Sequence, residues 1–460
     1  MRLRRARTIA AAFAILTIAA FFCRPAFALQ ITRTRLANGA ILLVSEQHQL
    51  PMVTVAIAFD AGSRRDPMGK EGLASLTAAA LTQGTKALTT AEFNQKVDFM
   101  GSSIGVEASA DYATATFTSL KKYEDDTIHL LAQTLAEPGL RDADIERKRA
   151  EQVADIRASE EEPGYTASVA ISKQLFGDEP YGHPSEGFAD TVSKLTSADV
   201  RAFYRDHYRM GSAVIAVTGD VDAAAIKQKL ERELIGLAGI VAAQAEPPAP
   251  NVAPGIHAKL IDRNVAQANL ILGSSGIARS NPDYYKLQVM NYILGGGGFA
   301  SRLMKVVRSK AGLAYGIQSA FHAGKFPGAF MIVLQTKNQS AQDALKLVLQ
   351  QLHEIQNAPV SDAEIDSAKK YLVGSFPLKL DRQSGIASFM LQTELYGLGI
   401  DYADRYPQLI NAVTKADVQK VAQQYLHPDA IVLAAVANQK EAKIDLASLA
   451  PQKQASAAKP

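Results

Sequence analysis

The chain contains the stretch Gly72-Leu73-Ala74-Ser75-Leu76-Thr77-Ala78-Ala79, followed shortly by Gln83-Gly84-Thr85. This stretch predicts a helix on which Ser75, Ala78 and Ala79, at positions i, i+3 and i+4, share one face. Histidines and a glutamate at these positions would hold a metal ion and activate its bound water. Alanine offers no lone pair, and a serine hydroxyl is a poor zinc ligand and a poor base near neutral pH. The helix therefore has the spacing of a metal site without the ligands.

The first 28 residues predict a secretory signal peptide. Arginines precede an apolar run from Ile9 to Phe22, and Ala26-Phe27-Ala28 has the small-x-small form of a cleavage site. The alternative, a retained anchor, needs roughly 20 apolar residues, and this run is shorter. The single cysteine, Cys23, falls in the signal, so a mature chain starting near Leu29 has no disulfide. We therefore expect a periplasmic protein, secreted through this signal and without a membrane segment after its removal.

The composition bounds the number of domains and the kind of partner. Without the signal the chain keeps about 430 residues, which exceeds one ordinary core and predicts at least two domains. Five of the 49 lysines and arginines lie in the signal, leaving 44 basic against 46 acidic residues. A nucleic-acid binder would be expected to carry a basic stripe, so this balance argues against a nucleic-acid partner.

Internal similarity indicates a duplication. A Pro/Ala-rich stretch at 242–256 predicts a linker between domains at 29–241 and 257–448, followed by a disordered tail at 449–460. Two short sequences recur at offsets of 220 and 218 residues, which predicts two homologous halves. The recurring pairs are Asp142-Ala143-Asp144-Ile145 with Asp362-Ala363-Glu364-Ile365, and Thr196-Ser197-Ala198-Asp199-Val200 with Thr414-Lys415-Ala416-Asp417-Val418.

Each half combines strands with helices. Apolar alternation or short apolar runs predict strands at 40–44, 52–60, 111–119 and 213–218. Threonine or serine followed three residues later by an acid predicts a helix start. The four such pairs are Thr89/Glu92, Thr196/Asp199, Ser361/Glu364 and Thr414/Asp417. The predicted fold class is α+β, with two homologous domains in which helices cover one face of a mixed or antiparallel sheet.

Several motifs occur in a fixed order along the chain. They are Leu36-Ala37-Asn38-Gly39, Gly72-Leu73-Ala74, Gln83-Gly84-Thr85, Tyr181-Gly182-His183-Pro184, Thr218-Gly219-Asp220, and the span from Ser301-Arg302-Leu303 to Gly312-Leu313-Ala314-Tyr315. In this order the chain resembles the insulinase/pitrilysin superfamily of zinc peptidases, and within it the bacterial relatives of the mitochondrial processing peptidase. The resemblance implies that the two domains form one processing-peptidase-like half of a clamshell.

The first half departs from the active members of this superfamily. They carry H-x-x-E-H on the helix, where this chain has Ser75, Ala78 and Ala79. A glutamate further downstream is their third ligand, and that position falls near Asp155, which we expect to be a solvated or salt-bridged helix residue. His183 is expected to shape a turn, and the eight histidines include no i, i+4 pair. We therefore expect no metal on this chain, and zinc on a partner subunit.

The second half keeps a pair that the resemblance associates with catalysis. Related peptidases carry an Arg and a Tyr seven residues apart that reach the catalytic centre of the opposing half, and Arg308 and Tyr315 match this pair. A tyrosine hydroxyl can donate to the growing negative oxygen of a tetrahedral intermediate. A guanidinium can bind a substrate carbonyl with rigid donors. The alternative is that Arg308 is an exposed helix charge and Tyr315 a core aromatic.

The run Gly295-Gly296-Gly297-Gly298 raises the question of a phosphate loop. It lacks the Lys-Ser/Thr that ends a P-loop, so a turn where the backbone approaches other backbone or a peptide is favoured. The residues before it, Tyr284, Leu287, Met290, Ile293 and Leu294, have helical spacing and are expected to be core.

The resemblance implies a non-catalytic subunit of a periplasmic zinc metalloendopeptidase. The partner would be a homologous H-x-x-E-H chain in a heterodimer, and the substrates would be peptides or unfolded polypeptides. A catalytically dead peptide-binding or scaffold protein is the alternative, although a scaffold has no need for Arg308 and Tyr315. An independent hydrolase is a third hypothesis, which the absence of clustered Cys/His residues and of a G-x-S-x-G elbow disfavours.

Overall fold

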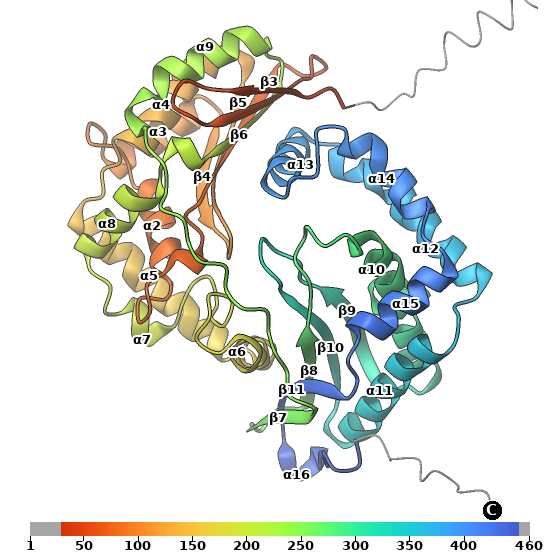
Figure 1. Ribbon diagram of the computed structural model, residues 1–460. Helices are drawn as coiled ribbons and strands as arrows, with labels where there is room; N and C mark the ends of the chain where they lie inside the picture. The colour runs from red at the N-terminus through yellow and green to blue at the C-terminus, as the bar shows by residue number, and fades with distance from the viewer. Residues whose placement is uncertain (1–28, 450–460) are drawn as a thin grey trace, which may run out of the picture.

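The protein consists of two sheet-and-helix halves that face each other (Figure 1). The computed structural model describes residues 29–449. The predicted signal peptide and all but the first residue of the predicted tail lie outside this range. Among the described residues, no helix is long and apolar enough to cross a membrane.

The first half contains a six-stranded sheet in the order β1-β2-β6-β3-β5-β4. Its strands are β1 Thr32–Arg35, β2 Ile41–Glu46, β3 Met52–Phe59, β4 Ser103–Ala108, β5 Ala113–Leu120 and β6 Val214–Gly219. Its helices are α2 Leu73–Leu81, α3 Thr90–Phe99, α4 Glu124–Ala136, α5 Asp142–Glu160, α6 Pro163–Phe176, α7 Ala189–Val192, α8 Ser197–His207 and α9 Ala223–Glu233.

The second half contains a five-stranded sheet in the order β7-β11-β8-β10-β9. Its strands are β7 Gly255–Asp262, β8 Gln267–Ser275, β9 Ala314–Phe321, β10 Ala329–Lys337 and β11 Ala430–Ala437. Its helices are α10 Tyr284–Asn291, α11 Ala341–Asn357, α12 Asp362–Ser375, α13 Gln383–Leu395, α14 Tyr402–Asn411, α15 Lys415–Tyr425 and α16 Gln439–Ala442.

The two sheets share one topology. The order β2-β6-β3-β5-β4 corresponds to β7-β11-β8-β10-β9, and β1 is an addition at the edge of the first sheet. In both sheets the first pair of this order is parallel and the remaining pairs are antiparallel. The recurring sequences also start equivalent helices, α5 with α12 and α8 with α15. The predicted fold class of two homologous mixed-sheet domains is therefore confirmed.

Local sequence signals placed the predicted strands and helix starts correctly. All four predicted helix starts are capping boxes, in which the Thr or Ser oxygen accepts the amide of the third helical residue. The acid at that third position accepts the cap residue's own amide in return, as Glu92 does from Thr89 at 2.8 Å. Caps of this kind contribute about 1 kcal/mol each to helix stability. The predicted strands correspond to β2, β3, β5 and β6, with ends shifted by one or two residues.

The segment between the halves runs without helix or strand from residue 238 to residue 254. It ends before the boundary predicted at 256, because Gly255 and Ile256 already pair with Ala430 and Ile431 in the second sheet. The segment is also tied to the first half, since Gln244 Nε2 donates to Arg64 O at 2.8 Å. At the C-terminal end of the second half, Leu449, the first residue of the predicted tail, is 7% exposed and packs on the core of that half.

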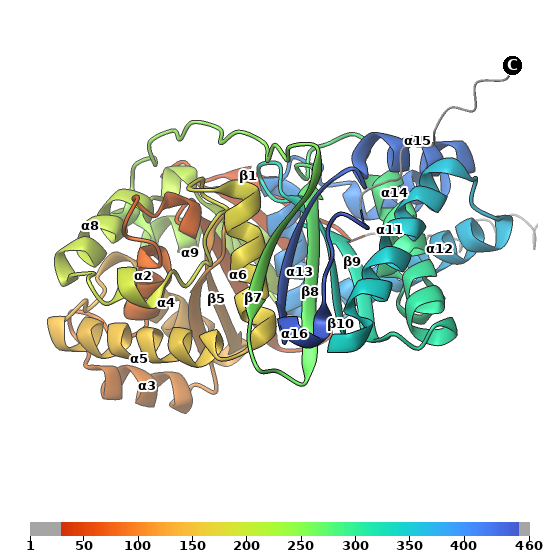
Figure 2. The same cartoon turned by 90° about the horizontal axis from the view of Figure 1, so that it is seen from below.

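Two helices are exchanged between the halves. Helix α6 belongs to the first half in sequence but packs on the second sheet, and α13 belongs to the second half but packs on the first sheet (Figures 1 and 2). Their first residues, Pro163 and Gln383, are 220 residues apart, the same offset that separates the first recurring pair. The exchange is therefore part of the duplicated design.

Buried side chains carry both contacts. Ile171 and Leu175 of α6 lie against Val432 and other apolar residues of the second sheet. Met390 of α13, which is fully buried, lies against Ile41 and its neighbours in the first sheet. Each sheet thus buries one face against its own helices and part of the other face against a helix of the opposite half.

The β9–β10 hairpin adds a polar contact between the halves. At its tip, Lys325 N donates to Asp111 Oδ2 at 2.8 Å, and Tyr181 O–H donates to Asp111 Oδ1 at 2.5 Å. Phe326 N in turn donates to the Tyr181 hydroxyl at 3.3 Å. The motif that contains Tyr181 and His183 therefore joins the halves, and His183 Nδ1 lies 2.9 Å from Pro184 O within a turn.

We expect that replacing Met390 with alanine will lower the free energy of unfolding by about 2–5 kcal/mol, the usual cost of a buried cavity. Leu378→Ala is the matched control because Leu378 is 70% exposed, and its effect should stay within about 0.5 kcal/mol. Urea unfolding of the three proteins measures both values. Equal effects of the two substitutions would show that α13 does not hold the halves together.

Candidate functional site

Helix α2 presents the predicted metal-site positions without any metal ligand. Ala78 is 1% exposed and belongs to the core of the first half, whereas Ser75 and Ala79 are half-buried. The start of the helix is fixed by Asp66, whose carboxyl oxygens accept from Gly72 N at 2.8 Å and Ala74 N at 2.7 Å. Sequence reasoning missed Asp66; its signal is an Asp-Pro pair six residues ahead of Gly72.

The surroundings of α2 do not supply substitute ligands. Helix α5 packs on α2, and Gln152 Nε2 donates to Gly72 O at 3.1 Å, but Asp155 on the same helix is exposed. Within residues 29–449 no group of three or more His, Cys, Asp or Glu side chains could hold a metal ion. The side chains at positions 75, 78 and 79 offer one hydroxyl and two methyl groups. These residues therefore do not offer the ligands for the zinc ion that active members of the superfamily are expected to bind at this site.

The structure brings Arg308 and Tyr315 together in the second half. Tyr315 lies at the start of β9 and is 77% exposed. Arg308 lies in a π-helical turn, Met304–Lys310, and its Cζ is 5.8 Å from the centre of the Tyr315 ring. The alternative that Tyr315 is a core aromatic is excluded, because most of its surface faces solvent.

A β-bulge turns Tyr315 outward. Gly316 pairs with Gln335 and Ala314 pairs with Thr336, so Tyr315 is an extra residue in β9. The bulge allows Ala314 and Ile317 both to be buried, with exposures of 7% and 4%. Bulges of this kind re-aim a side chain and are common beside active sites.

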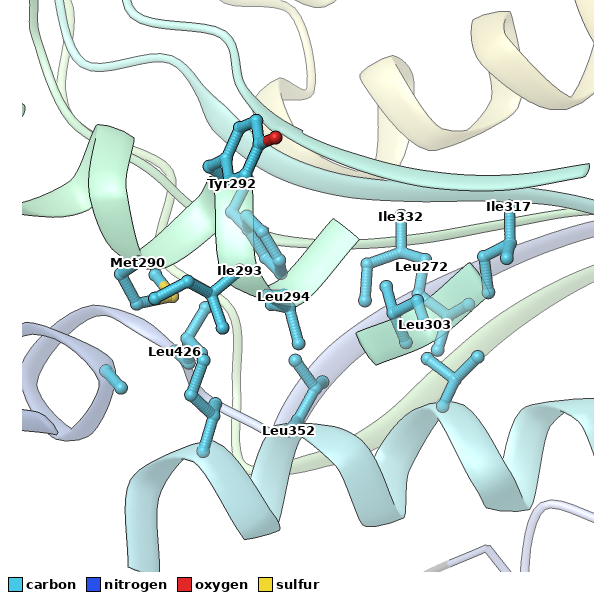
Figure 3. Packing of buried hydrophobic residues seen from close by; sticks show 14 of the residues in the cluster. Leu272, Met290, Tyr292, Ile293, Leu294, Leu303, Ile317, Ile332, Leu352 and Leu426 are labelled. Atoms are coloured by element: carbon cyan, nitrogen blue, oxygen red, sulfur yellow. The ribbon is translucent and has the colours of Figure 1, made fainter. Parts of the chain in front are cut away.

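Buried residues fix the segment that carries Arg308. Leu294, Leu303 and Ile317 pack in the core of the second half, together with Leu272 and Ile332 of the sheet (Figure 3). Four of the five predicted core residues before the glycine run are buried, and the fifth, Tyr284, is half-buried and packs against the same core. The four buried residues are Leu287, Met290, Ile293 and Leu294.

The glycine run ends a π-helical segment, Tyr292–Gly296, turns at Gly297 and packs against β9. A Cβ at Gly295 would lie 2.8 Å from Ser319 N, so only glycine allows this approach. The contact is locked by Asn291, whose Nδ2 donates to Ser319 O at 3.0 Å and whose Oδ1 accepts from Ser319 Oγ at 2.7 Å. The turn predicted from the sequence is present, and backbone approaches backbone there.

An ion pair anchors the other end of this segment. Arg302 donates to Glu364 at 2.7 and 3.0 Å in a bidentate geometry, and Glu364 also accepts from Ser361 N at 2.8 Å. The Arg302 guanidinium, helped by the Ser361 amide, lowers the pKa of Glu364 to about 2. This pair lies six residues before Arg308 and restricts the position of the helical turn between them.

A second exposed aromatic ring lies beside Arg308, which is itself half-buried. Phe299 is 71% exposed, and the Arg308 Cζ lies 4.7 Å from the centre of its ring. Sequence reasoning missed Phe299 because it read the glycine run only as a turn. The sequence signal for this role was an apolar residue that directly follows the glycine run and lies shortly before Arg308.

Two clefts lie along the second sheet beside α6. The first has a volume of about 460 Å³, is lined by Gly164, Asn269, Gln318 and Gln335, and lies near Tyr315. The second has a volume of about 570 Å³ and is lined by residues of both halves. Its lining includes Ser168, Ser172, Tyr181, His183, Phe321 and His322. Since Tyr315 lies near the start of β9 and Phe321 is its last residue, the clefts lie near opposite ends of this strand.

We expect Glu364→Gln to remove about 1 kcal/mol of stability at neutral pH, because it deletes a partly exposed bidentate ion pair. The folded pKa of Glu364 is lowered to about 2 from the ordinary 4.5, so this stability is present above pH 4.5 and is lost as pH falls toward 2.

Urea unfolding of the wild type and the variant between pH 3 and 7 measures the difference in stability, which should shrink below about pH 4.5. Glu160→Gln, at an exposed glutamate of α5, is the control. A difference that does not change with pH would contradict this assignment.

Comparisons with known proteins agree with this arrangement. The family model "Insulinase (Peptidase family M16)" matches residues 42–187, and the model "Peptidase M16 inactive domain" matches residues 194–372. The non-peptidase homolog YmxG of Helicobacter pylori is 26% identical over 404 residues, covering 87% of this chain and 93% of that protein. An uncharacterized zinc protease of Streptomyces coelicolor is 27% identical over 406 residues, covering 86% of this chain and 87% of that protein.

A solved structure has the same fold. The crystal structure of a peptidase M16 inactive domain from Pseudomonas fluorescens superposes with a TM-score of 0.83 at 29% identity, covering 89% of this chain and 98% of that one. The two family models together span more than half of the sequence. The chain therefore belongs to peptidase family M16. It is an inactive homologue within this family, because its helix α2 lacks every metal ligand.

Proposed function

We propose that this chain is the non-catalytic subunit of a periplasmic zinc-dependent peptidase. It contributes Arg308 and Tyr315 to the active site of a homologous partner that carries H-x-x-E-H. The observation that carries the proposal is the contrast within one chain: α2 has no metal ligand, while a bulge and an anchored helical turn hold Arg308 beside an exposed Tyr315.

The proposed chemistry of this subunit is hydrogen-bond donation. The Tyr315 hydroxyl faces solvent and is available to donate to the oxygen that becomes negative when a peptide carbonyl is attacked. One such donor typically contributes about 10²–10³ in rate. The Arg308 guanidinium, within cation–π distance of the Tyr315 ring, binds a neighbouring carbonyl of the substrate backbone and limits the motion of the phenol.

The proposed substrates are peptides and unfolded polypeptides. Clefts of about 460 and 570 Å³ near the two ends of β9 provide room for an extended chain along this strand. Strand β9 is the last strand of its sheet, so a peptide backbone can pair with its outer edge except around Ser319, whose carbonyl Asn291 already binds. A folded protein would not fit between the halves of a closed clamshell.

The proposed partner and location follow from the sequence. The partner supplies the zinc ion and the base, since residues 75, 78 and 79 here cannot hold the metal. The signal predicted at 1–28 and the absence of cysteine after it favour the periplasm.

A second candidate function is a peptide-binding or scaffold protein without any part in hydrolysis. The lack of metal ligands on α2 favours this second function, and so does the similarity to a protein described as a non-peptidase homolog. A scaffold does not require an exposed phenol beside a guanidinium, so the two functions predict different effects of substitutions there.

We expect the purified chain to be inactive on a quenched peptide, and a mixture with an H-x-x-E-H homologue from the same genome to cleave it. In the mixture Tyr315→Phe should lower kcat by about 10²-fold, because the phenol donor is lost while the ring remains. Arg308→Ala should also impair cleavage.

Tyr371→Phe is the control for the loss of a hydroxyl, since Tyr371 on α12 is 57% exposed and should be silent. A mixture whose activity ignores both Tyr315→Phe and Arg308→Ala would favour the scaffold. Cleavage by this chain alone would contradict both functions.

A further inference from the structure

Phe299 is held in place by the turn that follows the glycine run. Ala300 N donates to Gly297 O at 3.1 Å, and Ser301 N and Oγ donate to Gly298 O at 3.0 and 2.7 Å. Ser301 is fully buried, which fixes the end of the turn. Gly298 has φ +54°, a conformation that favours glycine. The turn therefore presents Phe299 in one direction although its side chain is 71% exposed.

The ring of Phe299 belongs to a continuous surface with the Arg/Tyr pair. Arg308 Cζ lies 4.7 Å from the Phe299 ring centre and 5.8 Å from the Tyr315 ring centre. A cation–π contact at each ring restricts the guanidinium and, in return, the rings. Single exposed apolar residues are common on proteins, but two exposed aromatic rings sharing one guanidinium form an apolar wall beside hydrogen-bond donors.

We propose that Phe299 is a specificity-determining residue, and that its ring receives a large apolar side chain of the bound peptide next to the cleaved bond. This inference rests on the proposed function. The proposed substrates are then peptides that carry an aromatic or large aliphatic residue next to the cleaved bond. Burial of such a side chain against a fixed ring is worth about tenfold in binding, whereas a serine side chain gains little from it.

The exposure of Phe299 leaves its ring accessible to a ligand and shows that the ring is not needed for core packing. Most of the Phe299 surface faces solvent, so its removal leaves no cavity in the core. Phe99, at the end of α3, is 77% exposed, and its ring centre lies 6.0 Å from that of the tilted Tyr123 ring. It provides a matched exposed phenylalanine in the opposite half of the chain.

The test uses the active mixture and a quenched peptide whose cleaved bond has been located by mass spectrometry. Peptide variants carry Phe or Ser at each of the two residues that flank this bond. The wild-type mixture should prefer Phe at one of them. Phe299→Ala should lower kcat/KM about tenfold for that Phe peptide and less than about threefold for the Ser peptide. Phe299→Leu should restore most of the preference, and Phe99→Ala should have no effect.

A binding arm keeps this inference separate from the proposed function. The fluorescently labelled Phe and Ser peptides are titrated with the purified chain alone, where no cleavage is expected. If the mixture proves inactive, the proposed function fails, yet tighter binding of the Phe peptide that disappears in Phe299→Ala still supports the apolar contact. Equal losses on both peptides, or a Phe299→Ala variant that behaves as wild type in both assays, would overturn the inference.

Discussion

The exchange of α6 and α13 between the halves is the interaction on which the remaining structure depends. Each helix buries apolar residues against a sheet formed by the other half of the sequence, with Ile171 and Met390 at the centres of the two contacts. The exchanged helices fix the two sheets relative to each other. They therefore also fix β9 relative to α6, and with it the clefts beside α6. The hydrogen bonds that Asp111 accepts from Tyr181 and Lys325 add a directional polar contact between the halves to this apolar packing.

The duplicated halves have diverged in chemistry while keeping one topology. In the first half the helix with the family's metal-site spacing retains its packing, since Ala78 is buried in the core, but it offers no ligand. In the second half the backbone around Arg308 is specialised: a bulge exposes Tyr315, glycines bring the chain against β9, and the Arg302–Glu364 pair anchors the helical turn. These features leave Tyr315 and Phe299 exposed beside Arg308, as a surface that meets a ligand requires.

Sequence reasoning succeeded where the signal is local. The capping boxes at Thr89, Thr196, Ser361 and Thr414 depend on residues three apart, and the buried strands depend on short apolar patterns. It could not foresee the helix exchange, because α6 and α13 pack on strands that lie far away in sequence. The bulge at Tyr315 depends on the register of β10, and the role of Phe299 depends on where the turn places its ring. Such features arise from tertiary contacts that no single segment encodes.

The central claim is a division of labour, in which this chain provides donors and another chain provides the metal. The most direct measurement is the zinc content of the dialysed chain alone and of its purified complex with the H-x-x-E-H homologue, determined by elemental analysis on protein of known concentration. The account predicts no stoichiometric zinc in the chain alone and one zinc ion for each complex. Stoichiometric zinc in the chain alone, accompanied by peptide cleavage, would contradict it.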